Sequence, residues 1–413
     1  MKIGVKKDMK DKQFVEQVIR NIGPVDEASR KACLNYWDQM GKPLHSLGKM
    51  ETMWAQLAAI QRTVHPSVNK RALVVMCADN GVVAEGVTQT GQEVTAIVAE
   101  NFFDDLTCTS LLCKNNRCDR YIVDIGMAVD TPRTIRCKVA YGTKNMAKEP
   151  AMTREEALAA IRVGIGMAEQ LKKEGYQILA TGEMGIGNTT TSSAVTAVLL
   201  KNKIVQEYLE KKNLHSNYED AKSSQESDMC LDVGTSTENI MNPGVWVDMS
   251  VCVEAVTGRG AGLSDEGLKH KKDAILRAIS INHPKPSDPI DVLAKVGGFD
   301  LAGLAGVFLG GAAMGLPVVI DGFISLAAAL LAARIAPECV AYMIPSHQSK
   351  EPGARLILEA LHLEPGLCMD MCLGEGSGAV ALLPFLDMAA EIYEHMGTFE
   401  DIRVEAYEDF GKM

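Results

Sequence analysis

Aromatic residues are scarce in this chain, making up 5% of its 413 residues, whereas glycine occurs 36 times. A core of this composition relies on small and aliphatic side chains that pack closely. The 11 cysteines are scattered and contain no Cys-x-x-Cys pair. We therefore expect no structural metal, and we interpret most cysteines as reduced, buried residues of a cytoplasmic protein.

The sequence also lacks an excess of basic residues. Its formal net charge is -11 at pH 7, which disfavours nucleic acid or an anionic membrane as the main partner. Residues 1–20 have no apolar core, so we expect no signal peptide. Only Leu301–Ile320 is uncharged over a length that could cross a bilayer. Its Gly and Ala content and the break at Pro317 favour a tightly packed helix followed by a buried strand.

Length and pattern predict one large domain and a smaller one. The chain, at 44.6 kDa, exceeds the usual size of a single domain. Apolar residues recur at helical spacing over residues 24–64, with Pro24 and Asp26 at the start, which predicts a helical N-terminal region. Between Lys201 and Val251 charged and polar residues interrupt the pattern, and we interpret this stretch as a partly helical surface insertion.

Five short apolar runs end in polar or glycine-rich segments. The first, Leu73–Cys77, is continuous rather than alternating, which is typical of a parallel strand buried on both faces. The same pattern recurs in four later runs, namely Tyr121–Ile125, Gln177–Ala180, Pro317–Ile320 and Val340–Ile344. Helical stretches separate the runs. This alternation predicts an α/β fold with a doubly wound parallel sheet and a ligand site at the carboxyl ends of the strands.

A glycine-rich segment, Thr181-Gly-Glu-Met-Gly-Ile-Gly-Asn-Thr-Thr-Thr191, follows one of these runs. Its backbone N–H groups, its hydroxyls and the amino end of the next helix would form a cradle for a phosphate monoester. It is neither a Walker loop, since Gly-Lys-Ser/Thr is missing, nor a GxGxxG dinucleotide loop. The alternative is a tight strand-to-helix turn without a ligand.

Glu375 lies between glycines in Leu373-Gly-Glu-Gly-Ser-Gly-Ala379, inside an apolar region. Burial would raise the basicity of such a carboxylate, which suits a general base. The alternative is an acid that caps a helix.

Two other segments are candidates for binding a phosphate or a sugar. Ile344–Gly353 follows a predicted strand and is rich in hydroxyls and turn residues. It contains His347, but no GxSxG elbow accompanies it, which favours an ordinary hydrogen-bonded histidine. Lys271 follows the glycine-rich Gly258–Gly262 and could reach an anion, although a lysine beside another lysine and a histidine is usually solvated.

The segment Phe102-Phe-Asp-Asp-Leu-Thr-Cys-Thr-Ser110 imitates the acidic loop of enzymes that use phosphoribosyl pyrophosphate. That loop should follow a hydrophobic strand. Here Thr95–Phe103 has the pattern of a helix, so we expect Asp104 and Asp105 at its solvated end.

Taken together, these segments resemble the nicotinate-nucleotide:dimethylbenzimidazole phosphoribosyltransferases of cobalamin assembly. The resemblance rests on blocks that follow in order over most of the chain: Lys42–Glu51, Val75–Val82, Glu85–Val87, Gly182–Thr190, Lys295–Leu301, Asp321–Phe323, Ser346–His347, Ser349 and Leu373–Gly378.

The resemblance implies a Rossmann-like catalytic domain over residues 71–384, with the insertion at 201–251, and a small helical domain formed by residues 1–70 and 385–413. It implies a homodimer, a catalytic base at Glu375 and a second site carboxylate at Glu183. The residues implied to hold the nucleotide phosphate and ribose are Gly185, Asn188, Thr189, Thr190, Lys271 and Ser349. Those implied for the base pocket are Asn80, Thr90, Val98, Met184 and Leu373.

The implied reaction moves ribose 5-phosphate from nicotinate mononucleotide to the lower-ligand base of a cobamide. Nicotinate leaves from a pyridinium, so neither a metal nor another cofactor is needed to draw off pyrophosphate. Glu183 and Glu375 would stabilise a cation-like sugar in the transition state. Glu375 would also take the proton of the attacking azole nitrogen, and inversion would give an α-riboside.

Three departures from the family pattern concern the base pocket. Asn80 stands where many relatives have His, Gly91 replaces a usual Pro, and Val98 replaces a usual Gln. They leave dimethylbenzimidazole, another benzimidazole, adenine or a phenol open as the acceptor. Two rival classes are a pyrophosphate-dependent phosphoribosyltransferase and a catalytically silent nucleotide-binding protein. Activity without magnesium would distinguish the base-exchanging transferase from the pyrophosphate-dependent class. Two acids buried near one another, Glu183 and Glu375, argue against a silent binding protein.

Overall fold

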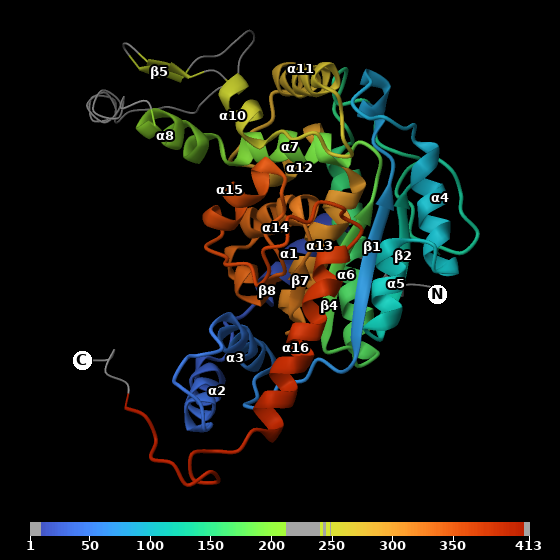
Figure 1. The fold of residues 1–413 in the computed structure, drawn as a ribbon. Coiled ribbons are helices and arrows are strands. Elements are labelled where there is room, and N and C mark those ends of the chain that lie inside the picture. Colours follow the sequence, from blue (N-terminus) through green and yellow to red (C-terminus); the bar gives the residue numbers. More distant parts are fainter. Residues whose placement is uncertain (1–9, 212–239, 243–244, 248, 409–413) are drawn as a thin grey trace.

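A six-stranded parallel sheet forms the centre of the protein (Figure 1). The computed structural model describes residues 10–211, 240–242, 245–247 and 249–408. The strands are β1 (Arg71–Ala78), β2 (Cys118–Gly126), β3 (Ile135–Arg136), β4 (Ile178–Met184), β7 (Val318–Ile320) and β8 (Met343–Pro345). Their order is β3-β2-β1-β4-β7-β8, so the chain reverses direction across the sheet between β1 and β4. The predicted doubly wound α/β fold is confirmed, and its ligand-binding switch point lies between these two strands.

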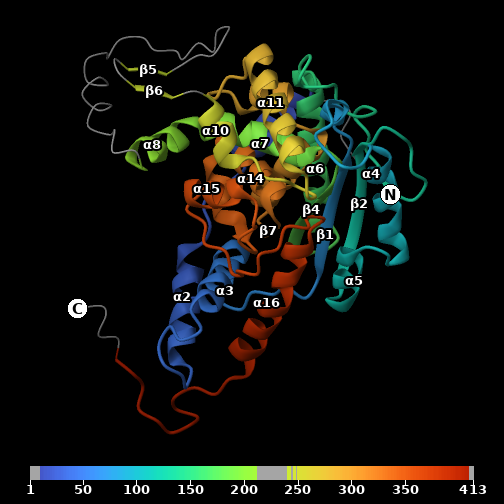
Figure 2. The same cartoon turned by 45° about the horizontal axis from the view of Figure 1, so that its top comes forward.

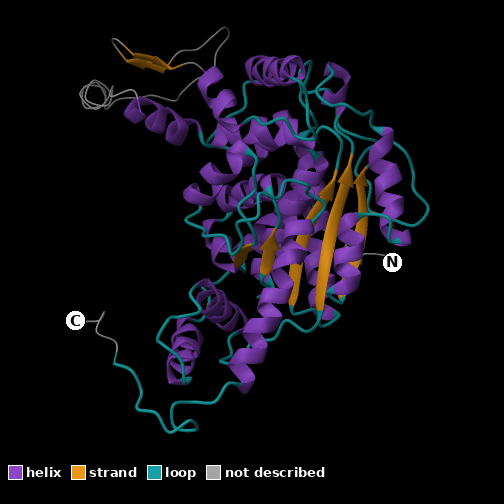
Figure 3. Cartoon of the chain, viewed as in Figure 1, coloured by secondary structure: helices purple, strands orange, loops and turns teal. Residues whose placement is uncertain are grey.

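Helices cover both faces of the sheet (Figure 3). One face carries α1 (Asp11–Arg20), α6 (Arg154–Lys173), α13 (Phe299–Ala313) and α14 (Phe323–Ile335). The other carries α4 (Glu93–Asn101), α5 (Cys108–Asn115) and α16 (Ser377–His395). Further α-helices within the described residues are α2 (Glu27–Gln39), α3 (Lys49–Gln61), α7 (Asn188–Leu199), α8 (Lys201–Lys211), α10 (Met249–Val256), α11 (Asp265–Asn282), α12 (Pro289–Val296) and α15 (Pro352–Ala360).

β1 is buried along its whole length, and its alternate side chains enter two different cores. Val74 and Met76 belong to the core beneath α6, α13 and α14, whereas Leu73 and Val75 belong to the core beneath α5 and α16. Because both faces are covered, the strand has no need of polar residues on either side. This explains why the apolar run is continuous, as the sequence predicts.

The contact between α6 and α13 depends on glycine. A Cβ atom at Gly164 would lie 1.9 Å from the carbonyl oxygen of Gly303, and one at Gly306 would lie 2.0 Å from that of Ile161. The two backbones therefore touch without intervening side chains. The uncharged stretch Leu301–Ile320 consists of most of α13 followed by β7, as predicted. Within the described ranges no helix is long and apolar enough to cross a membrane.

Two predicted strands have different bounds in the structure. β4 continues past Ala180 to Met184, because it pairs residue by residue with β1 from Arg71 to Cys77. The start of the predicted glycine-rich loop therefore belongs to the strand. The prediction for Val340–Ile344 was also partly wrong, because Pro337–Tyr342 forms a 3-10 helix and β8 starts at Met343. Proline favours the first position of a helical turn.

α2 and α3 pack together and beside α16 (Figures 1 and 2). α3 also reaches the edge of the sheet, because Gln56 Nε2 donates to the carbonyl oxygen of Met343 in β8 at 2.9 Å. Tyr393 of α16 contacts Trp37 and Trp54, with ring centroids 5.0 and 6.0 Å apart. α1 does not join them, because Val15 and Val18 are buried in the core on the α6 side. We propose that α2, α3 and the end of α16 form the small helical domain.

The predicted insertion, Lys201–Val251, includes described and undescribed residues. α8 is helical, as expected, and buries Ile204, Val205 and Leu209 in the core on the α6 side. β5 (Ile240–Asn242) and β6 (Val245–Val247) pair as an antiparallel hairpin. Residues 212–239, 243–244 and 248 lie outside the described part of the chain.

Candidate active site

A cavity of about 350 Å³ opens at the carboxyl ends of the central strands. Its walls include the end of β4 and the segments after β7 and β8. The predicted site residues that line it are Thr90, Glu183, Met184, Gly185, Asn188, Thr189, Ser349, Leu373 and Glu375. Residues far apart in the sequence therefore meet where a doubly wound sheet is expected to bind its ligand.

Glu375 lies in a turn of three residues with left-handed backbone: φ is 85° at Gly374, 61° at Glu375 and 90° at Gly376. This conformation is unfavourable for glutamate, so the surroundings must hold it. Burial raises the pKa of the Glu375 carboxyl, a hydrogen bond from Thr109 lowers it, and nearby Asp321 raises it. The net upward shift makes the carboxylate a stronger base near neutral pH.

Asp321 holds the turn that carries Glu375. Its Oδ2 accepts a hydrogen bond from Gly376 N at 3.0 Å, and its Oδ1 accepts bonds from Gly378 N at 2.7 Å and Ala379 N at 3.1 Å. α16 begins here without a capping side chain of its own, so Asp321 supplies the cap from another part of the chain. The helix-capping alternative for Glu375 is wrong, because Asp321 has that role.

Glu183 is buried at the end of β4 and connects two parts of the site. Its Oε1 accepts a hydrogen bond from Glu375 N at 3.4 Å, and its Oε2 accepts a short one from Asn188 Nδ2. Burial first, and then the charges of Asp300 and Asp321, raise the pKa of Glu183 to about 8. These surroundings therefore favour the protonated form of Glu183 in the protein by itself.

Asp300 completes this acidic cluster and was missed in the sequence. It is fully buried on the first turn of α13, and its Oδ2 has no hydrogen-bond partner among the described residues. Burial raises the pKa of Asp300 to about 6, although Leu301 N donates to its Oδ1 at 2.9 Å. Asp321 directly follows a predicted strand, so the strand-end pattern could have identified it. Asp300 falls inside the block Lys295–Leu301 on which the family resemblance rests, but no site role was assigned to it there.

Lys271 is fully buried, contrary to the expectation for a solvated helix lysine. Its Nζ donates hydrogen bonds to Thr189 Oγ1 at 2.9 Å and to the carbonyl oxygen of Gly258 at 3.0 Å. Burial lowers the pKa of Lys271 to about 8, while Glu351 raises it. Thr189 lines the cavity, as does Arg259, which the sequence did not single out. Lys271 therefore stands behind the amino end of α7, where a phosphate monoester would bind, whereas the Arg259 guanidinium pairs with Asp265.

Some predicted residues lie behind the cavity wall or away from it. Asn80 is fully buried and donates to the carbonyl oxygen of Ile186 at 3.4 Å, and Ile186 lines the cavity. Thr190 is fully buried in α7. Val98 packs against the core on the α16 side and does not line the cavity. The structure thus brings Thr90, Met184 and Leu373 of the predicted base pocket to the cavity surface.

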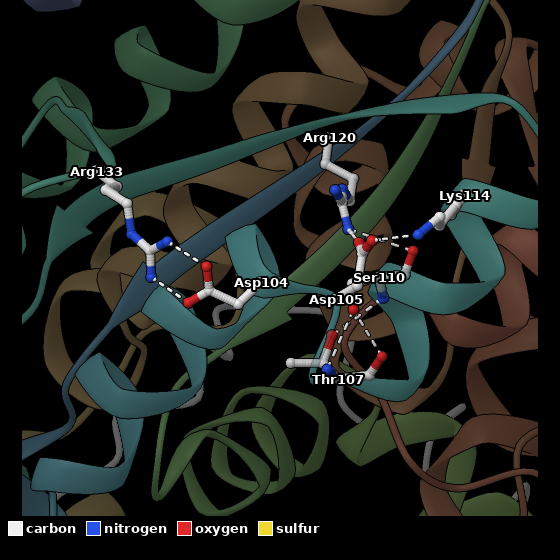
Figure 4. A network of polar contacts seen from close by, with 7 residues as sticks. All are labelled: Asp104, Asp105, Thr107, Ser110, Lys114, Arg120 and Arg133. Atoms are coloured by element: carbon white, nitrogen blue, oxygen red, sulfur yellow. Dashed lines mark hydrogen bonds and ion pairs between the residues drawn. The ribbon is translucent and has the colours of Figure 1, made fainter.

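The acidic pair at residues 104 and 105 lies outside the cavity, in an ion-pair network (Figure 4). Asp104 Oδ1 pairs with Arg133 at 2.7 Å, and Asp105 pairs with Arg120 at 2.6 Å and with Lys114 at 2.9 Å. α4 precedes the pair, as predicted. Both acids are already occupied by cations, so they do not form a magnesium–pyrophosphate loop.

His347 is buried beside Ser346, as expected for an ordinary hydrogen-bonded histidine. Its Nδ1 lies 3.0 Å from Ser346 Oγ, and both residues are buried. Ser346 does not line the cavity, so this pair offers no serine nucleophile to a ligand. Within the described ranges, no three His, Cys, Asp or Glu side chains are placed to hold a metal ion.

Comparison with known proteins places this geometry among phosphoribosyltransferases. A family model described as phosphoribosyltransferase matches residues 22–210 and 245–404, leaving residues 211–244 unmatched. A nicotinate-nucleotide–dimethylbenzimidazole phosphoribosyltransferase of Ruminiclostridium cellulolyticum is 43% identical over 95% of this chain and 98% of that protein. An enzyme of the same name from Acetivibrio thermocellus is 42% identical over the same shares.

The fold has close structural relatives as well. A crystal structure of the nicotinate-nucleotide–dimethylbenzimidazole phosphoribosyltransferase of Thermus thermophilus superposes with a TM-score of 0.74 at 36% identity. The matched region covers 92% of this chain and 99% of the Thermus thermophilus chain. The two ranges matched by the family model include the segments that line the cavity.

Proposed function

The chain belongs to the family of nicotinate-nucleotide:dimethylbenzimidazole phosphoribosyltransferases, and on this premise we propose that it transfers ribose 5-phosphate from nicotinate mononucleotide to 5,6-dimethylbenzimidazole in cobalamin biosynthesis. The products are nicotinate and α-ribazole phosphate. The observation that carries the proposal is that Glu183 and Glu375 share one cavity with Thr189, which is bonded to the buried Lys271. The cavity thus combines two acids for a cationic sugar with a cationic site for a phosphate.

In this proposal Glu375 is the general base. The azole nitrogen attacks C1 of the ribose as the bond from C1 to the pyridinium nitrogen breaks, and nicotinate leaves with that electron pair. The azole proton passes to the Glu375 carboxylate. Attack from the face opposite nicotinate inverts the configuration and gives the α-riboside. The raised pKa of Glu375 supports this role, because a stronger base accepts the proton more readily near neutral pH.

Glu183 stabilises positive charge only after losing its own proton. Its pKa is raised to about 8 by burial and neighbouring acids, and the pyridinium of the nucleotide opposes those causes. Where the pyridinium lies nearer to Glu183 than the anionic carboxylate and phosphate of the nucleotide do, it would favour the loss of that proton. The resulting carboxylate would face the sugar as it becomes cation-like.

The nucleotide phosphate would bind at the start of α7. Gly185, Asn188 and Thr189 line the cavity there, Lys271 backs Thr189, and Thr190 lies in the same helical turn as Thr189. Ser349 lines the cavity from the segment after β8 and would contact the ribose. We add Arg259 to this set, because it lines the same cavity.

The acceptor would bind against Thr90, Met184 and Leu373, with Asn80 acting on the pocket through Ile186. We leave Val98 out, since it packs into a core. Another benzimidazole, adenine and a phenol are the alternative acceptors, because Asn80 and Gly91 depart from the family pattern. A panel of these bases with nicotinate mononucleotide and a chelator, followed by mass spectrometry, identifies the preferred acceptor.

Substitution of Glu375, the proposed general base, tests the mechanism. In Glu375→Gln we expect kcat to fall by about 100-fold or more, with the KM for the nucleotide little changed. Glu149→Gln is the matched control, since Glu149 is an exposed acid paired with Lys144. An unchanged rate in Glu375→Gln would refute the assignment. Product formed only with phosphoribosyl pyrophosphate and magnesium would instead indicate the pyrophosphate-dependent class.

We further propose a homodimer in the cytoplasm. Ile97, Leu106 and Leu111, on and around α4 and α5, are 55%, 70% and 54% exposed, which is typical of a protein interface. Nine cysteines of the described ranges, Cys252 left aside, carry free thiols, as in a reducing compartment. Sedimentation equilibrium of the wild type and of Leu106→Glu tests the dimer, which the charged variant should weaken.

A further inference from the structure

The segment that imitates a pyrophosphate loop has a different contact with the site. Thr109, on the first turn of α5, is fully buried, and its Oγ1 lies 3.3 Å from Glu375 Oε2. We propose that Thr109 is a positioning residue that orients the Glu375 carboxylate by donating this hydrogen bond. The inference rests on the proposed function, in which Glu375 is the base.

The start of α5 is fixed from both sides. Thr107 and Ser110 form a reciprocal cap, with Ser110 N donating to Thr107 Oγ1 at 3.0 Å and Thr107 N donating to Ser110 Oγ at 3.1 Å (Figure 4). Just before it, Asp105 has a left-handed backbone and binds Arg120 of β2 and Lys114 of α5. Thr109 therefore projects from a helical turn that the cap and the ion pairs hold in place.

The Thr109 bond occupies one oxygen of the carboxylate. With Oε2 bound, Oε1 is the oxygen left for the proton of the acceptor base. The backbone of Glu375 is held separately, because its N–H donates to Glu183 and Asp321 binds the turn that follows. Backbone and carboxylate thus have different anchors. A bound hydroxyl also limits rotation of the carboxylate, which keeps the base aimed during the reaction.

The same bond affects basicity. Burial raises the pKa of Glu375, the Thr109 hydrogen bond opposes that shift, and Asp321 raises the pKa further. Glu183 from β4 faces the Glu375 turn, and His347 lies beside Asp321. Lys114 of α5 is already paired with Asp105. Without Thr109 the remaining influences all favour the protonated form, so Glu375 would lose its proton at a higher pH.

Thr109→Val removes the hydroxyl at nearly constant volume, and Thr109→Ser keeps a donor. We expect Thr109→Val to lower kcat about tenfold with the nucleotide KM nearly unchanged, as for a lost hydrogen bond to a charged group. The acid limb of its kcat/KM profile should move to higher pH. Thr109→Ser should recover most of kcat. Thr196→Val is the control, because Thr196 is equally buried and bonds only within α7, to Ser192 O.

Two results would overturn the inference. One is a wild-type kcat and pH profile in Thr109→Val while Glu375→Gln is inactive, which leaves the proposed function intact. The other is a fall in kcat in Thr109→Val that Thr109→Ser does not restore and that is accompanied by a lower melting temperature, which would indicate a structural role alone. If Glu375→Gln stays active, the proposed function fails instead. The carboxyl pKa of Glu375, measured by carbon-13 NMR titration, tests the contact without turnover and should rise in Thr109→Val alone.

Discussion

Lys271 Nζ lies 2.9 Å from Thr189 Oγ1, although the two residues are 82 positions apart in the sequence. Thr189 faces the cavity and Lys271 stands behind it, fully buried. A cation in this position costs folding free energy, because burial disfavours its charged form. The protein retains it at the point where a phosphate would bind.

Lys271→Met should weaken nucleotide binding without unfolding the protein. We expect the KM for nicotinate mononucleotide to rise about tenfold or more, as for a lost charge-assisted hydrogen bond. The pKa of Lys271 is lowered to about 8, so the unfolded chain binds more protons than the folded one above that pH. Wild-type stability should therefore rise from about pH 8 towards pH 10, and this rise should be missing in the variant.

The control is Lys272→Met. Lys272 is the next residue and pairs with Glu254 at 2.6 Å, away from Thr189. Its loss should leave KM and the pH dependence of the melting temperature as in the wild type. Equal KM values for the two variants would contradict a phosphate-binding role for Lys271.

Glu183→Gln should change how stability depends on pH. The folded pKa of about 8 lies above the ordinary value of 4.5 for a glutamate, so the folded state holds a proton that the unfolded chain has lost. The stability from this group is present below about pH 4.5 and is lost as the pH rises through 8. The melting temperature of Glu183→Gln relative to the wild type should therefore be higher at pH 9 than at pH 6. A constant difference between the two proteins would exclude the shift.

Asp321→Asn should reduce both stability and turnover. An asparagine amide has a single acceptor oxygen, so it cannot accept all three backbone hydrogen bonds that the Asp321 carboxylate accepts. Its NH₂ group would face one of the backbone N–H donors. We expect a loss of about 1–3 kcal/mol in unfolding free energy and a lower kcat. Asp288→Asn is the control. Asp288 caps α12 through Ile290 N and Asp291 N at 3.1 Å and does not line the cavity, so this variant should lose stability but keep kcat.

Gly182→Ala should displace the general base, Glu375, although Gly182 itself lies in strand β4. A Cβ at this position would lie 2.6 Å from the carbonyl oxygen of Glu375, so the turn would have to move. A displacement of about 1 Å in a catalytic group lowers turnover about 100-fold. Gly23→Ala, where no atom lies within 4 Å of the added carbon, should be as active as the wild type. Full activity in Gly182→Ala would show that the Glu375 turn is not tightly placed.

The sequence predicted the sheet well because its strands are short, apolar and separated by helices. β1 and β2 appear within a few residues of their predicted positions, and the helix before Asp104 is confirmed. The end of β4 was missed because Thr181, Gly182 and Glu183 look like a loop. They are strand residues because β1 pairs with them, which is a long-range contact that local pattern does not contain.

The site was predicted through its loops, and the residues behind those loops were missed. Glu183 and Glu375 stand beside glycines, which drew attention to them. Asp300 lies in an apolar helix, and Thr109 lies in a segment interpreted as an imitation of another motif. The burial of Lys271 also depends on elements distant in sequence, whereas its neighbouring lysine and histidine predict a solvated position. Each of these misses concerns a tertiary contact rather than a local conformation.

The glycine contact between α6 and α13 has a consequence for how this enzyme can evolve. Asp300 lies on the first turn of α13, one turn before Gly303, so the height of this helix above α6 fixes the depth of Asp300 under the cavity. No smaller residue exists, and any larger one acts as a spacer that lifts the helix. A side chain at Gly164 or Gly306 would thus displace Asp300 together with α13, and so disturb the acidic cluster as well as the core.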